Sequence, residues 1–89
     1  MAIIRFTSTL VRHRPAPDLA APGPTVRAVL DAALADDALL KSYLLDEQGR
    51  VRKHINIFAD GVMIADRVSL SDPVGPASEI YVLQALSGG

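Results

Sequence analysis

Apolar residues alternate with polar ones near the start of the chain, a pattern typical of a half-buried strand. Over residues 3–11, Ile4 and Phe6 alternate with Arg5 and Thr7. Successive side chains of a strand point to opposite faces, so we expect a first strand whose inward face carries Ile4 and Phe6.

Residues 12–24 contain four prolines and are expected to form a loop. Proline has no backbone N–H to donate to a sheet, so at most a brief edge strand at residues 18–20 fits this segment. The cluster Arg12-His13-Arg14 opens the loop. Two interpretations of this cluster stay open: a solvated loop tip, or a binding site for an acidic partner surface.

The next stretch has the spacing of amphipathic helices. Thr25 is expected to be an N-cap because its hydroxyl can accept from a first-turn amide, and Arg27 and Asp31 would then point outward. Asp36-Asp37 can cap a second segment, residues 38–45, and the pattern fits either one helix or two. The expected inward positions are Val26, Val29, Leu30, Ala33, Leu34, Leu40, Tyr43 and Leu44.

The clearest strand prediction covers residues 51–59. It is preceded by turn residues that end in Gly49, and it is followed by Asp60-Gly61, a strong signal for a type I′ hairpin. Residues 62–64 should therefore pair back antiparallel. One face of the predicted strand carries Val51, Ile55, Ile57 and Ala59, and the other carries Arg52, His54, Asn56 and Phe58.

A last strand is expected to start at Glu79. Prolines break residues 67–78 twice, so turns should lead into this strand. Three apolar residues of this stretch are expected to pack on the core: Val68, Leu70 and Val74.

The predicted order of elements is strand, loop, helix, hairpin, irregular crossover and strand. This order favours an α+β fold, a mixed sheet with helix packed on one face, and one domain spanning residues 1–89. The first and last strands are the most apolar, so we expect them to be central neighbours.

The last strand is apolar on both faces, because Ile80 and Val82 alternate with Tyr81 and Leu83. A sheet with one solvated face would normally show polar residues there. With Phe58 expected beside Tyr81 or Leu83, the second face would be an exposed apolar patch of the kind that often marks a partner site. The alternative is that the loop of residues 12–24 covers it.

Composition excludes several kinds of function. The net charge of −1 argues against nucleic-acid binding through bulk electrostatics. No apolar run is long enough to span a membrane and no signal-peptide pattern is present, so we expect a cytoplasmic protein. Cysteine is absent, which excludes disulfides and thiolate chemistry.

The sequence contains no recognisable catalytic or metal-binding motif. His13 and His54 lie far apart, without ligand spacing, and no nucleophile stands in a supporting context. Asp36 and Asp37 read as a helix cap, and His54 reads as a surface residue rather than a base. We therefore expect no catalytic residue and no metal site.

The sequence ends on Gly88-Gly89, two residues without side chains that can thread a narrow channel and present a carboxylate. Together with the element order, four segments make the chain resemble the ubiquitin-like β-grasp sulfur carriers, which serve molybdopterin, thiamine and cysteine biosynthesis. These segments are the Thr25-Val26 helix start, the run RKHINIFADG (52–61), the lead-in Ser78-Glu79-Ile80 and the final ALSGG (85–89).

The resemblance implies a β-grasp sheet of four to five strands followed by a flexible tail, residues 85–89. It also implies that an activating enzyme, similar to those that activate ubiquitin, adenylates the Gly89 carboxylate with ATP. A sulfur donor would then displace AMP, leaving a thiocarboxylate that passes its sulfur to a downstream synthase. The chain would be a carrier, not an enzyme, with no bound cofactor. Its tail residues would be Leu86, Ser87 and Gly88, and its partner-binding residues Phe58, Tyr81 and Leu83.

Other functions fit the same resemblance. One is a ubiquitin-like modifier joined through Gly89 to a target lysine, for which Lys41 and Lys53 could serve chain formation. Another is the small subunit of a molybdopterin-synthase-like complex, although that type often has proline at the position of Gln84 or Ala85. The length and the 52–61 run look closer to the carriers of cysteine or thio-natural-product pathways. A further alternative to the sulfur carrier is a non-covalent β-grasp adaptor.

Overall fold

The computed structural model describes residues 1–6 and 18–84. Outside the described residues lie the predicted tail (85–89), residues 7–11 of the expected first strand, and residues 12–17 of the proline-rich loop with the Arg12-His13-Arg14 cluster. Within the described part, the elements are β1 (Ala2–Phe6), β2 (Leu19–Ala21), α1 (Val26–Ala33), α2 (Ala38–Leu44), β3 (Ile55–Ala59), β4 (Val62–Met63) and β5 (Glu79–Gln84).

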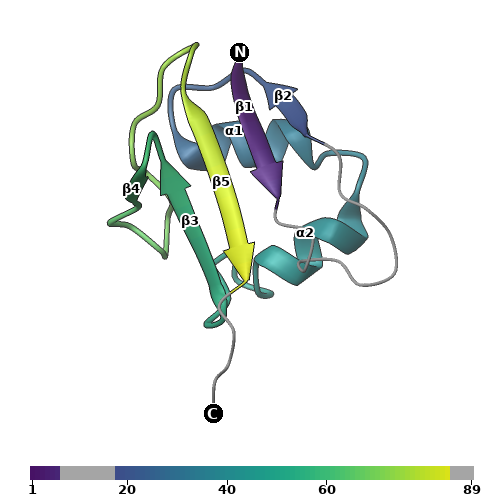
Figure 1. The fold of residues 1–89 in the computed structure, drawn as a ribbon. Coiled ribbons are helices and arrows are strands. Elements are labelled where there is room, and N and C mark those ends of the chain that lie inside the picture. Colours follow the sequence, from purple (N-terminus) through teal and green to yellow (C-terminus); the bar gives the residue numbers. More distant parts are fainter. Residues whose placement is uncertain (7–17, 85–89) are drawn as a thin grey trace.

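The strands form one mixed sheet in the order β2-β1-β5-β3-β4. β1 and β5 are central neighbours and run parallel, with Ile4 opposite Ile80, which confirms the predicted pairing of the first and last strands. β2 pairs antiparallel with β1 at the sheet edge, and β3 pairs antiparallel with both β5 and β4. Figure 1 shows β5 crossing the middle of the sheet.

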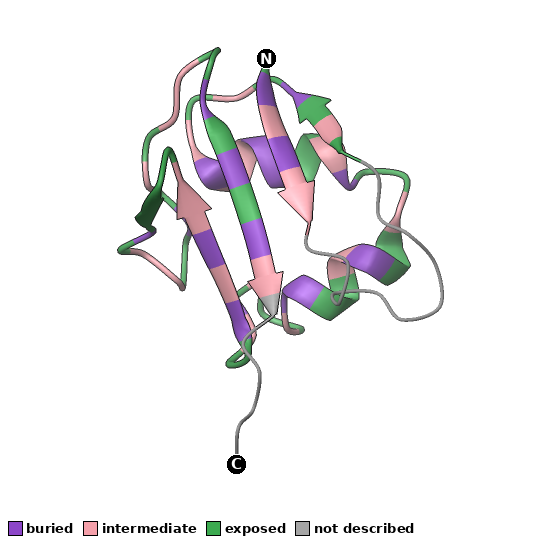
Figure 2. Ribbon diagram, viewed as in Figure 1, coloured by how far each residue is buried: buried purple, intermediate pink, exposed green. Residues whose placement is uncertain are grey.

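Both helices lie on the same side of the sheet, so the described residues form the two-layer α+β arrangement expected from the sequence. Buried and exposed residues alternate along β5 in Figure 2, because every second side chain points to the helices. The fully buried side chains are Ile4, Val26, Val29, Leu30, Leu34, Leu44, Ile55, Ile57, Leu70, Ile80 and Val82.

Local capping separates the two helices. The Thr25 hydroxyl accepts from the Ala28 amide at 3.2 Å, which confirms Thr25 as the N-cap of α1. The Asp37 carboxylate accepts from the Leu40 amide at 3.0 Å and caps α2. Of the two possibilities that the sequence left open, the structure therefore has two helices.

The strand predicted over residues 51–59 begins only at Ile55. Val51 instead forms an isolated bridge with Leu45, and the Ile55 amide donates to the Arg52 carbonyl across a turn. The Arg52 guanidinium donates to the Ser42 carbonyl at 2.7 Å. The prediction was wrong for residues 51–54, because Val51 and Arg52 bond to the end of α2 rather than to the sheet, and Lys53 and His54 form a turn.

Two residues expected in the core are exposed. Tyr43 has 39% of its surface accessible, because it lies on the side of α2 away from the buried pair Leu40 and Leu44. Val68 is 61% exposed, since it belongs to a turn that directs only Leu70 fully into the core.

The Asp60-Gly61 hairpin is confirmed. Both residues have positive φ, 52° and 84°, as a type I′ turn requires. The Asp60 carboxylate accepts from the Glu79 amide at 3.0 Å and from the Ser78 hydroxyl at 2.8 Å. These hydrogen bonds lower the pKa of Asp60 and fix the hairpin to the start of β5.

A second carboxylate organises the loop between β4 and β5. Asp66 accepts from the Ser71 hydroxyl at 2.6 Å and from the Ser69 amide at 2.9 Å, and these contacts lower its pKa to about 2. Asp72 accepts from the amides of Ala65 and Asp66, both at 2.9 Å. The loop is thus held by side-chain acceptors where no strand partner is available.

Replacing Ile57 with alanine should reduce the free energy of unfolding by about 2–5 kcal/mol, because Ile57 is fully buried on the helix side of β3. The matched control is Asn56→Ala, which lies next to it on the other face and should cost within about 0.5 kcal/mol. Urea unfolding monitored by circular dichroism measures both. Equal losses would contradict the register of β3, which turns Ile57 to the helices and Asn56 away from them.

The ionised Asp66 carboxylate should contribute to the free energy of unfolding at neutral pH but not in strong acid. Its pKa is about 2 in the folded chain against 3.8 ordinarily, so its contribution is present above about pH 4 and lost as the pH falls towards 2. Asp66→Asn should therefore lower the urea midpoint at pH 6, and the gap from the wild type should close near pH 2. Asp36→Asn is the control, because Asp36 makes no hydrogen bond or ion pair within residues 1–6 and 18–84. A gap that persisted at pH 2 would count against this role.

Candidate partner-binding face

The face of the sheet turned away from the helices carries a row of apolar side chains. The register places Phe58 of β3 opposite Tyr81 of β5 and also opposite Met63 of β4. Leu83 follows on β5, opposite Asn56. We call Phe58, Met63, Tyr81 and Leu83 the aromatic face.

The aromatic face is accessible. Tyr81 is 40% exposed and Met63 47%, while Phe58 and Leu83 are half-buried. On the same strand as Tyr81 and Leu83, Ile80 and Val82 are fully buried against the helix side. β5 is therefore apolar on both faces, as the sequence indicated. No helix of the described part of the chain covers this second face (Figure 2).

Charged residues border the aromatic face on the β1 side. Arg5 stands opposite Tyr81 in the parallel register, and its guanidinium lies 3.4 Å from Glu79 and 3.8 Å from Asp18. These ion pairs are exposed, so each contributes little stability. They give the apolar row a polar margin, an arrangement common in protein interfaces.

The end of β5 that leads towards Gly89 is held in a defined place. Gln84 is the last strand residue and pairs with Ile55, the first residue of β3. The Arg67 guanidinium donates to the carbonyls of Arg52 at 2.7 Å and Ile55 at 2.6 Å. The Val51 amide donates in return to the Arg67 carbonyl. Two guanidinium–carbonyl hydrogen bonds therefore fix the backbone beside the end of β5.

The structure brings together the three residues predicted to bind a partner: Phe58, Tyr81 and Leu83. The predicted tail residues lie outside the described residues, namely Leu86, Ser87, Gly88 and Gly89. Met63 was missed. The hairpin contained the signal, because pairing outward from Asp60-Gly61 sets Val62 opposite Ala59 and Met63 opposite Phe58.

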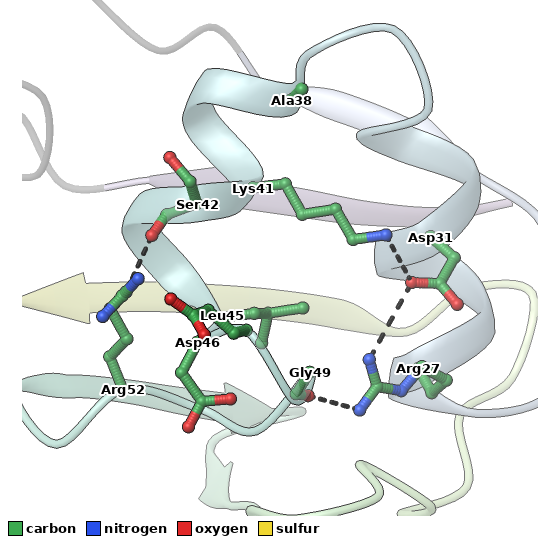
Figure 3. A pocket seen from close by; sticks show the side chains of 10 residues that line it. Arg27, Asp31, Ala38, Lys41, Ser42, Leu45, Asp46, Gly49 and Arg52 are labelled. Carbon is green, nitrogen blue, oxygen red and sulfur yellow. Dashed lines mark hydrogen bonds and ion pairs between the residues drawn. The ribbon is translucent and has the colours of Figure 1, made fainter.

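A separate open cleft of about 420 Å³ lies between α1, α2 and the turn that follows α2 (Figure 3). Arg27 was expected to point outward, but it is half-buried and donates to the carbonyls of Gly49 and Val68. Lys41 lies 3.3 Å from Asp31, and the Arg52 guanidinium donates to Ser42. The cations of this cleft are therefore engaged in holding the helices to the turn.

No metal centre can be assembled from the described residues, because they contain no group of three or more His, Asp or Glu that could hold an ion. His54 was expected on the outer face of a strand, but it lies in the turn before β3 and is exposed. No helix of the described residues is long and apolar enough to cross a membrane.

Comparison of the sequence with family models gave no match, and no curated protein sequence matches either. Comparison of the structure gave full-length matches. A chain of the Amycolatopsis orientalis BexX/CysO complex superposes with a TM-score of 0.82 and 21% identity, covering 100% of each chain. Mycobacterium tuberculosis CysO superposes with a TM-score of 0.77 and 18% identity, over 97% of this chain and 100% of the other.

SAMP1, the small archaeal modifier protein 1 of Haloferax volcanii, is also similar. It superposes with a TM-score of 0.75 and 22% identity, over 99% of this chain and 98% of the other. These similarities establish the fold. The chain has the ubiquitin-like β-grasp fold that its sequence resembles.

Proposed function

We propose that this chain is a sulfur carrier whose reactive group is the Gly89 carboxylate. One carboxylate oxygen attacks the α-phosphorus of ATP held by an activating enzyme, pyrophosphate leaves, and an acyl-adenylate forms. Hydrosulfide released by the sulfur donor then attacks the carbonyl carbon and loses its proton. The C–S bond forms, AMP leaves, and the product is a Gly89 thiocarboxylate.

The observation that carries this proposal is the position of the aromatic face relative to the tail. Tyr81 and Leu83 stand on the exposed side of β5, and β5 is the strand that continues in sequence into residues 85–89. A partner that binds the aromatic face is thereby placed beside the base of the tail. Five residues follow Gln84, so Gly89 can reach at most roughly 17 Å beyond the end of β5.

The solved neighbours support the proposal in a second way. One of them comes from a complex of CysO with another protein, BexX, and it has the same fold over its whole length. A small β-grasp chain of this architecture is therefore known to form a complex with another protein. We propose three partners for this chain: an adenylyltransferase similar to ubiquitin-activating enzymes, a sulfur donor and a sulfur-accepting synthase.

The chain itself then needs no catalytic residue. Gly89 is the residue whose atoms react, Gly88 supplies backbone freedom, and Ser87 is small enough for a narrow channel. Leu86 and the aromatic face supply apolar contact. ATP is bound by the activating enzyme, and because that step consumes ATP we place the carrier in the cytoplasm.

The likeness to SAMP1, a protein named as a modifier, favours a second candidate function. In that case the acyl-adenylate passes to a lysine amine, and Gly89 ends in an amide bond. Of the two lysines of this chain, Lys53 is exposed and Lys41 lies 3.3 Å from Asp31, so Lys53 is the more accessible acceptor for chain formation. The small subunit of a molybdopterin-synthase-like complex is a third candidate that uses the same tail.

The intact mass of the protein recovered from its native cells, beside a sample treated with ATP and the activating enzyme of the same genome, tests the proposal. We expect a shift equal to exchanging one oxygen for sulfur. The shift should disappear when Gly89 is deleted or Gly88 is replaced by Trp, while the unfolding midpoint stays unchanged. Conjugates of high mass joined through Gly89 would favour the modifier. Full activity of either variant would exclude both functions.

Tyr81→Ala should lower kcat/KM for adenylation at least about ten-fold, because exposed aromatic residues at the centre of an interface often contribute more than about 1.4 kcal/mol to binding. The control is Val62→Ala, which also removes an exposed apolar side chain, 70% accessible, but lies outside the aromatic face. Pyrophosphate release measures both variants. Equal rates for the two variants would show that the aromatic face is not where the enzyme binds.

A further inference from the structure

Positive charge gathers where β5 ends. An open cleft of about 520 Å³ at this end of the sheet is lined by Asp46, Val51 and five basic residues. Four of the nine lysine and arginine residues of the chain are among them. We call these five residues the basic rim: Arg50, Arg52, Lys53, His54 and Arg67.

Most of this charge is not neutralised by carboxylates. Arg50 pairs with Asp46 at 3.1 Å. Arg52 and Arg67, in contrast, donate to backbone carbonyls, which are neutral and leave the guanidinium charge intact. Lys53 makes no ion pair within the described residues. The rim is therefore net positive, although the whole chain has a net charge of −1.

The fold accounts for some members of the rim but not for all. Arg52 and Arg67 hold the turn before β3 to α2 and to the following loop, so their positions have a structural reason. Lys53 and His54 are both exposed at the tip of that turn, and neither hydrogen-bonds to the rest of the described chain. They lie directly before Ile55, which pairs with Gln84 at the end of β5.

We propose that the basic rim docks on an acidic surface of the activating enzyme, around the mouth of the channel that receives the tail. This inference rests on the proposed function. A tail that must enter a channel needs its base held in one orientation, and complementary charges at the base steer association towards that orientation. The aromatic face makes the apolar contact, and the rim adds the directional, salt-sensitive contact.

The nucleotide phosphates fit the basic rim less well than an acidic protein surface does. Gly89 lies five residues beyond Gln84, so a tail extended into a channel would carry its carboxylate up to roughly 17 Å from the end of β5, away from the rim. The guanidinium groups of Arg52 and Arg67 are also already donating to backbone carbonyls. A carboxylate-rich protein surface, which requires net charge rather than a preformed anion pocket, fits the rim better.

Steady-state adenylation by the activating enzyme of the same genome, followed by pyrophosphate release at about 50 mM and about 300 mM NaCl, tests the inference. Lys53→Gln should lower kcat/KM about three-fold at low salt, and Lys53→Glu about ten-fold, with kcat unchanged because steering acts on association. Lys53→Arg should retain the wild-type value. At high salt the differences should shrink to within about two-fold, because screening weakens exposed charges.

The matched control is Ala77→Glu, which changes the net charge by the same amount as Lys53→Gln. Ala77 is exposed just before the start of β5, about one strand length or roughly 17 Å from the rim. It should behave as the wild type at both salt concentrations. Loss of activity equal to that of Lys53→Gln would mean that only net charge matters, and would overturn the inference.

Different experimental results would contradict the inference about the basic rim and the proposed carrier function. A wild-type protein that is adenylated normally, with Lys53 variants that match it at low salt, would overturn the basic rim and leave the carrier function standing. Differences that persist unchanged at high salt would also overturn it, because a steering role must be screened. A wild-type protein that the enzyme never adenylates would overturn the proposed function and this inference together.

Discussion

The parallel pairing of β1 with β5 is the constraint on which the rest of the structure depends. Parallel neighbours require a crossover connection, and both helices and the β3–β4 hairpin lie between these two strands in sequence. The crossover places both helices on one side of the sheet, which buries Ile80 and Val82. It also leaves β5 in the middle of the sheet, with β3 as its other neighbour.

β5 consequently serves two purposes with its two faces. The residues turned to the helices contribute to the core, whereas Tyr81 and Leu83 form an accessible apolar surface together with Phe58 and Met63. An exposed apolar surface does not stabilise a free domain and favours association. Its place on the strand that leads towards Gly89 is therefore better explained by function than by folding. The Arg5 ion pairs and the basic rim border it with charge.

Between α2 and β5 in the sequence, the segments outside β3 and β4 have no strand partner. Side chains bond to the backbone groups of these segments instead. Asp66 and Asp72 accept from the amides of the loop after β4, and Asp60 accepts from Glu79 at the start of β5. Arg27 donates to the carbonyl of Gly49 and Arg67 to that of Arg52, both in the turns that follow α2. Buried or half-buried backbone groups need partners, and these side chains supply them where no strand is available. In this way both ends of β5 are fixed although the connections around it are irregular.

The sequence by itself determined the features that depend on neighbouring residues. Thr25 and Asp37 cap helices through amides three residues away, and Asp60-Gly61 turns because of its own φ angles. The apolar character of the first and last strands predicted the central pair, and the order of elements predicted the α+β fold. Phe58, Tyr81 and Leu83 of the aromatic face were predicted from alternation along β3 and β5, because every second side chain of a strand points to the same face.

The tertiary structure alone decided what depends on distant segments. Arg27 bonds to carbonyls 22 and 41 residues away, so no local pattern indicated that it would be half-buried. The strand predicted from Val51 starts at Ile55 because the backbone of Val51 and Arg52 bonds to the end of α2 instead. Four members of the basic rim are neighbours in the sequence, but only the folded loop that Asp66 holds brings Arg67 to them. Periodicity states which way a side chain points, but the segment that comes to meet it is set by the packing of the whole chain.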